Sequence, residues 1–130
     1  MDKLSLPEQL ETLATEVVDA CFQVHKELGP GLLESVYQTC LCHELNLRKL
    51  KFRREVSFPV VYKNLKLESG VRLDLLVEEQ IILELKAVET VLEVHKVQLL
   101  SYLRITSLNL GFVVNFNVPR FKQGIHRIVH

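Results

Sequence analysis

The chain has 130 residues, of which 48% are hydrophobic and 25% are charged, with 16 basic and 16 acidic side chains. This length supports one domain with a sizeable core, so we expect residues 1–130 to form a single domain. The composition excludes a disordered or low-complexity chain, and the formal net charge of zero gives no general argument for a polyanionic partner.

Two further features favour a cytoplasmic protein. The N-terminus lacks a basic flank followed by an apolar run, and no stretch approaches the length of a membrane span, so we expect no membrane partner. The three cysteines, Cys21, Cys40 and Cys42, form no CxxC pair, and we interpret them as reduced thiols.

Two helices are predicted in the N-terminal third of the chain. Ser5 and Glu8 have capping-box spacing, and apolar residues then repeat at helical spacing as far as Leu28. Gly29-Pro30-Gly31 ends this helix, and a second helix is expected from about Leu32 to Leu47.

Glu34 is the first candidate for a functional residue. It lies in the first turn of the second helix, three residues before Tyr37 and therefore at the margin of the buried face. The exposed amides of a helix N-terminus stabilise a carboxylate. A role in stabilising the helix therefore accounts for Glu34 as well as a functional role does.

The densest positive run is Arg48-Lys49-Leu50-Lys51-Phe52-Arg53-Arg54. On a neutral protein such a run is usually a solvated corner. If nucleic acid binds, we expect phosphate contacts here, from Lys49, Lys51, Arg53 and Arg54.

A strand is expected from about 52 to 62, with Pro59 confining that part of it to an edge or a bend. Lys63-Asn64 then turns the chain. A short strand over 65–68 leads through Gly70 into the next segment.

A hairpin over residues 71–86 is the centre of the predicted sheet. Two aliphatic and β-branched runs flank Glu78-Glu79-Gln80, a polar interruption with the length of a turn. With the turn centred on the middle of this tripeptide, Asp74 faces Glu84 across the strands, and Lys86 joins them on one face. The other face is expected to lie on a core, and it carries Val71, Leu73, Leu75, Val77, Ile81, Leu83, Leu85 and Ala87.

Two facing carboxylates repel each other unless a cation or a proton lies between them. Because the donors are oxygens and no Cys or His cluster is present, Mg²⁺ or Mn²⁺ is favoured over zinc. A simple ladder of ion pairs, in which Lys86 neutralises Asp74 and Glu84, is the alternative.

The C-terminal third reads as helix, strand and a further short strand. Helical periodicity runs from about Val91 to Ile105 and places Gln98 and Tyr102 on one face. The continuous apolar run over 110–116 predicts a strand buried on both sides, so a right-handed crossover and a parallel pair are expected. Residues 124–129 are interpreted as one more strand.

Three motifs carry a resemblance to a known family. Asp74, followed after nine residues by Glu84-Leu85-Lys86, resembles the D…ExK core of the PD-(D/E)XK nuclease superfamily, with Leu73 in place of the proline. Gln98 and Tyr102 resemble the QxxxY element of its RecB-like branch. The segment from Gly31 through Glu34 to Tyr37 resembles the GxxExxY signature of a compact family of the superfamily.

The resemblance implies a restriction-endonuclease-like α/β fold with a mixed sheet, two N-terminal helices, a central β-hairpin, a crossover helix and a following parallel strand. It also implies a nuclease that depends on Mg²⁺ or Mn²⁺, that is, a hydrolase that cuts phosphodiester bonds with metal-activated water. We expect the substrate to be DNA.

The same resemblance implies roles for individual residues. Asp74 and Glu84 would bind the metal, with the Leu85 carbonyl as an extra ligand and Glu34 supporting the ion or its water. Lys86 would orient the attacking water. Two residues from the crossover helix, Gln98 and Tyr102, would brace the site or touch the substrate backbone.

A second hypothesis is a catalytically silent module that keeps the nuclease fold and binds nucleic acid or a protein partner. The complete acidic set favours the enzyme. The neutral charge and the lack of a specificity domain favour the silent module, or else a nuclease that needs a homodimer or a protein partner to hold DNA.

Overall fold

A computed structural model describes residues 5–130 of the chain. In chain order the elements are α1 (Glu8–Leu28), α2 (Glu34–Leu47), β1 (Phe52–Tyr62), β2 (Leu65–Val77), β3 (Ile81–Lys86), α3 (Glu93–Thr106), β4 (Leu110–Asn115), the short 3-10 helix η1 (Phe121–Gln123) and β5 (Ile125–Val129). The first helix, predicted to start near Ser5, begins at Glu8 without a side-chain cap. The helix starts after Pro7 because the proline ring disfavours helical geometry at the residue before it, Leu6.

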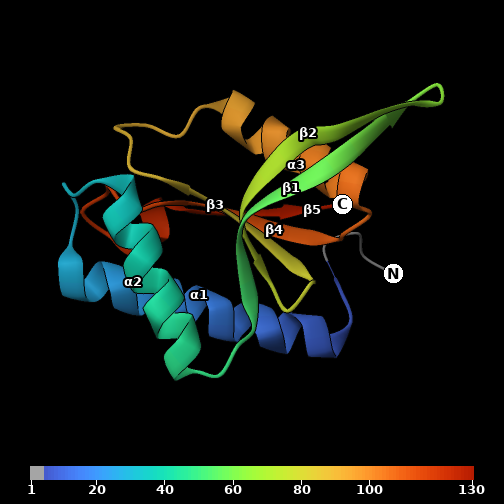
Figure 1. Cartoon of the computed structure of the whole chain (residues 1–130). Coiled ribbons are helices and arrows are strands. Elements are labelled where there is room, and N and C mark those ends of the chain that lie inside the picture. The colour runs from blue at the N-terminus through green and yellow to red at the C-terminus, as the bar shows by residue number, and fades with distance from the viewer. Residues whose placement is uncertain (1–4) are drawn as a thin grey trace.

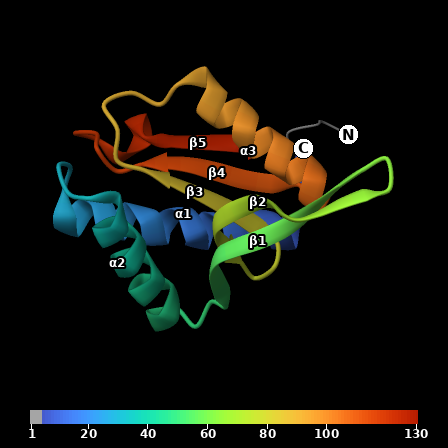
Figure 2. The ribbon, with the colours of Figure 1, turned by 45° about the horizontal axis from the view of Figure 1, so that its top comes forward.

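The five strands form one mixed sheet in the order β1-β2-β3-β4-β5. Strands β3 and β4 are parallel, and the other neighbouring pairs are antiparallel. The ribbon views place α1 and α2 on one face of the sheet and α3 on the other (Figures 1 and 2). The predicted α/β class, hairpin, crossover and parallel strand are therefore confirmed.

Each face of the sheet has its own core. On the α1 and α2 side, Leu75, Leu83 and Leu85 pack among helix residues such as Tyr37. On the α3 side, a smaller core contains Val56, Leu73, Leu76, Ile82, Leu99, Leu103 and Val113. Because successive strand residues point to opposite faces, both cores draw on the central hairpin.

The prediction that eight apolar residues share one face of the hairpin is wrong for two of them. Val71 and Leu73 belong to the core beneath α3, whereas Leu75 belongs to the core beneath α1 and α2. Residues two apart on a regular strand share a face, so β2 changes faces at Asp74. Glu55, which lies across from Asp74 on β1, has a left-handed φ of 52°. The change of faces thus coincides with the left-handed backbone of Glu55 on the neighbouring strand, and periodicity alone does not reveal it.

Beyond this point, β1 and β2 continue as a two-stranded ribbon that extends away from the body of the molecule (Figures 1 and 2). The ribbon stands apart because β3 pairs with β2 only over Leu75–Val77. Lys63 and Asn64 turn the chain with φ values of 46° and 72°, as in a tight hairpin turn. The short strand predicted over 65–68 is thus the outer half of β2.

Candidate active site

The carboxylates of Asp74 and Glu84 lie at the centre of the sheet, where β2 and β3 separate. Oε2 of Glu84 accepts a hydrogen bond from the Asp74 backbone N–H at 2.8 Å. In return, Oδ2 of Asp74 accepts one from the Leu85 backbone N–H at 2.8 Å. The regular pairing of the two strands stops one residue earlier, at Leu75 and Leu83. Each carboxylate therefore takes the place of a strand-to-strand hydrogen bond, and the structure brings the two predicted acids together.

Burial raises the pKa of both acids, and a neighbouring carboxylate raises each further, Asp74 for Glu84 and Glu55 for Asp74. Burial raises the pKa of Glu84 to about 8, the Asp74 charge adds to this effect, and only 5% of Glu84 is exposed. Burial also raises the pKa of Asp74, while the Leu85 hydrogen bond and the Lys86 charge oppose the rise. Lys86 alone does not compensate the two acids. The site therefore carries a proton near neutral pH unless another cation is supplied.

Glu34 approaches this pair from the first turn of α2. Partial burial raises the pKa of Glu34, the Asp74 charge raises it further and Lys86 lowers it. The start of α2 is held by Tyr37, whose hydroxyl donates to the Gly29 carbonyl at 2.6 Å and accepts from the Leu32 N–H at 3.1 Å. The tyrosine predicted as part of a signature is therefore buried and secures the loop that positions Glu34.

The Tyr37 ring is itself clamped. It stacks on Phe116 with ring centroids 4.6 Å apart and an interplanar angle of 6°. Phe116 follows β4 and donates its backbone N–H to the Lys86 carbonyl at 3.0 Å, so the loop before α2 is tied to the end of β3.

Gln38 and Glu55 lie at the site and were missed by the sequence analysis. The Gln38 amide donates to Oε1 of Glu55 and to the Asp74 carbonyl, both at 3.3 Å. Glu55 also accepts from Nε of Arg72 at 2.7 Å. The spacing of four residues after Glu34 was a usable signal for Gln38. No local signal marks Glu55, because its position depends on the register of β1 against β2.

Tyr102 of α3 is half-buried and lies close to the acids. Burial raises the Tyr102 pKa, and the charges of Glu84 and Asp74 raise it further. Gln98, one helical turn earlier on the same face, is exposed. His95 accepts a hydrogen bond from the Leu92 N–H through Nδ1 at 3.0 Å, so it caps the start of α3.

Asn115 is a third residue that supports the site and to which the sequence analysis gave no role there. It is 1% exposed, and its Oδ1 accepts from the N–H groups of Val88 and Asn117, both at 3.1 Å. Its Nδ2 donates to the Val88 carbonyl at 2.8 Å. These bonds hold the segment that directly follows Lys86. An asparagine at the end of a buried apolar run was the available signal.

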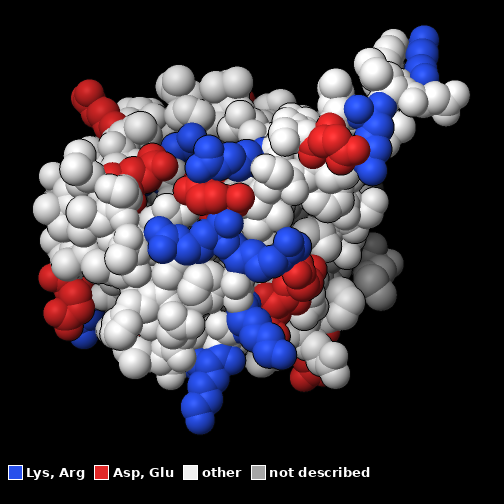
Figure 3. All heavy atoms as spheres, in the orientation of Figure 1, with Lys and Arg blue, Asp and Glu red and all other residues white. Residues whose placement is uncertain are grey.

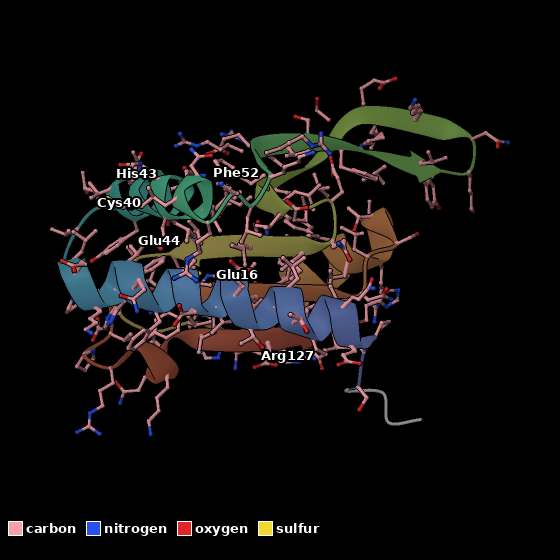
Figure 4. All side chains as sticks on the ribbon, turned by 90° about the horizontal axis from the view of Figure 1, so that it is seen from below. Glu16, Cys40, His43, Glu44, Phe52 and Arg127 are labelled. Carbon is pink, nitrogen blue, oxygen red and sulfur yellow. The ribbon has the colours of Figure 1, made fainter. Side chains whose placement is uncertain are left out.

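The predicted basic run is partly neutralised within the chain. Arg48 binds Asp19 and Glu44 at the crossing of α1 and α2, each at 2.8 Å, and Figure 4 shows Glu44 on the side of α2 that faces α1. Arg53 pairs with Glu79 at 2.9 Å. In Figure 3, acidic and basic side chains alternate over this face of the molecule.

The other predicted phosphate contacts, Lys49, Lys51 and Arg54, are exposed. Within residues 5–130, none of these three forms an ion pair. Of the four predicted phosphate contacts, Arg53 is thus the one that forms an ion pair within residues 5–130, and it is itself exposed.

The donor chemistry of the site fits a hard divalent cation. In the described part of the chain, no group of three or more His, Cys, Asp or Glu residues is arranged to hold a metal. Asp74 and Glu84 nevertheless each use only one oxygen in their hydrogen bonds to the backbone, which leaves the second oxygen for another ligand. A buried and a partly buried acid with raised pKa values suit Mg²⁺ or Mn²⁺, because such an ion prefers oxygen ligands and compensates their charge.

A mixed sheet covered by helices on both faces, with an aspartate and a Glu-x-Lys sequence on adjacent central strands, defines the class of restriction-endonuclease-like nucleases. A family model described as the PD-(D/E)XK nuclease superfamily matches residues 11–128. The chain therefore belongs to the PD-(D/E)XK nuclease superfamily, which indicates a nuclease function and a nucleic-acid partner.

Two other comparisons gave no relatives: neither the curated proteins nor the solved structures contain a significant match to the chain. Over residues 5–130, no helix has the length and apolar character needed to cross a membrane.

Proposed function

We propose that this protein is a metal-dependent nuclease that hydrolyses phosphodiester bonds in DNA. One observation carries the proposal: Asp74 and Glu84 are held together at the centre of the sheet, and their pKa values stay raised although Lys86 lowers both and Arg72 lowers that of Asp74. Burying two acids side by side is unfavourable unless a cation compensates them. Such a cost is typical of a site arranged for function rather than for stability.

The second oxygens of Asp74 and Glu84, with the Leu85 carbonyl, would hold Mg²⁺ or Mn²⁺, and Glu34 would support the ion from α2. When bound, the ion would neutralise charge on the phosphate and make a water nucleophilic near neutral pH.

The chain's other groups would position the reactants. The Lys86 ammonium would orient the attacking water and stabilise negative charge that develops on the phosphoryl oxygens. Tyr102, which lies close to the acids, and Gln98 one turn before it would bind the sugar-phosphate backbone.

We further propose that the chain falls in the GxxExxY family of the RecB-like branch. The contacts of Tyr37 with Gly29 and Leu32 support this assignment, because they give the last residue of that signature a defined role in positioning Glu34. We also propose a cytoplasmic location, which accords with the three free cysteines.

The test combines calorimetric titration of Mg²⁺ and Mn²⁺ with cleavage assays on single- and double-stranded DNA and RNA. Wild type should bind metal and cut DNA, whereas Asp74→Ala should lose both properties and stay folded. Glu27→Gln, which removes an exposed acid from α1, is the matched control and should behave as wild type. A wild-type protein that neither binds metal nor cuts any substrate contradicts the proposal.

The second candidate function is a non-cleaving module that binds nucleic acid or a protein partner. The hydrogen bonds that Asp74 and Glu84 accept from backbone amides favour it, because they stabilise the two acids without a metal. Nucleic-acid binding without cleavage, unchanged in Asp74→Ala, would support this module over the enzyme.

A further inference from the structure

The outer ribbon, residues 57–71 of β1 and β2, exposes apolar side chains far from the site. Six consecutive residues of β2, from Leu65 to Gly70, are exposed. The exposed fractions are 66% for Val61, 61% for Tyr62, 59% for Leu65 and 49% for Leu67. A cluster of this kind on a soluble domain marks an interaction surface.

Most of these side chains lie on one face of the ribbon. Val60 pairs with Leu67, and Tyr62 pairs with Leu65, so the four share a face. The same face continues inward to Val71, which packs on the core beneath α3. The apolar surface is therefore an extension of a core into solvent, supported by only two strands. A two-stranded ribbon is marginally stable in water, and more strands stabilise it.

The two edges of the outer ribbon differ. On β1, Pro59 lacks an amide hydrogen, and the strand pairing shifts register there, with residues 68–70 of β2 opposite this one residue of β1. A proline on an edge strand blocks pairing with another chain. From Leu65 to Leu67, where its pairing with β1 is regular, β2 has no proline and, within residues 5–130, no strand on its outer side. The edge of β2 is therefore the one that another strand can join.

The charges along this edge are complementary to themselves. In an antiparallel pairing of two β2 edges around a two-fold axis at Leu67, Lys66 of each copy faces Glu68 of the other, and the two Leu67 side chains meet. In the single chain these charges form a weak ion pair, with 3.7 Å between Nζ of Lys66 and Oε1 of Glu68. Opposite charges directly across a strand pair stabilise it, and like charges destabilise it.

We propose that the outer ribbon binds a second copy of this chain, with the two β2 strands paired antiparallel about Leu67. The pairing joins two ribbons into one four-stranded sheet and places apolar side chains of both copies side by side. The proposal is independent of the nuclease function, because it uses none of the residues of the acidic site.

Sedimentation velocity over a range of concentrations tests this dimer on the full chain. Wild type should dimerise. Lys66→Glu and Glu68→Lys should each weaken the dimer at least about tenfold, since each places like charges opposite each other twice. The double reversal, Lys66→Glu with Glu68→Lys, should restore it, and an equal mixture of the two single variants should form a mixed dimer. Lys122→Glu, an exposed reversal on η1, is the matched control and should dimerise as wild type.

A wild-type protein that is monomeric at about 100 μM, well above the Kd of a specific dimer, overturns the proposal. The outer ribbon would then be a binding surface for a different protein. A dimer that neither single reversal weakens, or that the double reversal fails to restore, also overturns it. Circular dichroism verifies that each variant is folded, and the mixing experiment depends only on folded single variants.

Discussion

The inner half of β2, next to β3, and its outer half, in the ribbon, each contain a group whose environment costs stability, but the groups are of opposite kinds. In the inner half, the Asp74 carboxylate lies between Leu73 and Leu75, which are fully buried, and its pKa is raised. In the outer half, Leu65 and Leu67 are exposed on a ribbon that projects from the sheet. A buried acid and an exposed apolar group both cost stability. One strand thus carries two features that binding would offset, by a cation at its inner end and by a protein surface at its outer end.

The largest expected effect concerns catalysis at the inner half. Asp74→Asn and Glu84→Gln keep the size of the side chains but remove the negative charge, so metal-dependent cleavage should fall by about 100-fold or more. Steady-state cleavage of DNA at saturating Mg²⁺ measures this loss. Cleavage that persists in both variants would show that the buried acids are not the metal ligands.

The stability of the protein should depend on pH, and the group responsible is Glu84, which lies beside the inner half of β2. The pKa of Glu84 is about 8 in the folded protein against 4.5 in the unfolded reference, so between these values the folded state holds an extra proton. Without metal, the free energy of unfolding should therefore fall as pH rises from about 4.5 to about 8, by several kcal/mol. Urea titrations of wild type and Glu84→Gln at each pH measure it. The variant should lose most of this dependence, and a parallel dependence in both proteins would contradict the assignment.

Two matched truncations compare the halves directly. Leu73→Ala opens a cavity in a fully buried position and should lower the free energy of unfolding by about 2–5 kcal/mol. Leu67→Ala, which is half exposed, should lower it by less than about 1 kcal/mol at concentrations where the protein is monomeric. Urea denaturation measures both values. Equal losses would mean that the outer ribbon packs as tightly as the inner half.

The smallest expected effect concerns the exposed basic side chains beside the site. Replacing Lys51 and Arg54 by glutamate should lower affinity for DNA several-fold, and the slope of log affinity against log salt concentration should decrease by about 1 for each phosphate that is no longer neutralised. Fluorescence anisotropy at several salt concentrations, with catalysis suppressed by chelation of the metal, measures both quantities. Lys122→Glu is the control. Unchanged affinity and salt dependence would exclude these residues as DNA contacts.

Local patterns were enough to predict the central hairpin and its acids. The polar tripeptide 78–80 sets the turn, and the turn sets a register that pairs Leu75 with Leu83 and brings Asp74 and Glu84 together one residue further on. The crossover from β3 through α3 to β4 likewise follows from the order of a strand, a helix and an apolar strand.

The tertiary structure decided what lies around those acids. The contacts of Gln38 with Glu55 and Asp74, and the pairing of Arg53 with Glu79, join residues that are distant in the sequence. Such contacts depend on how elements pack and not on the periodicity within any one of them.

The change of faces at Asp74 belongs to the same group of tertiary features. Leu73 and Leu75 join different cores where Glu55 of the paired strand has a left-handed backbone, and the alternation of residues along β2 does not reveal this. By itself, the amino-acid sequence therefore determined that Asp74 and Glu84 come together and which elements hold them. Only packing decided which core each strand residue joins, which charges are neutralised, and which apolar side chains stay exposed, because these outcomes depend on long-range contacts.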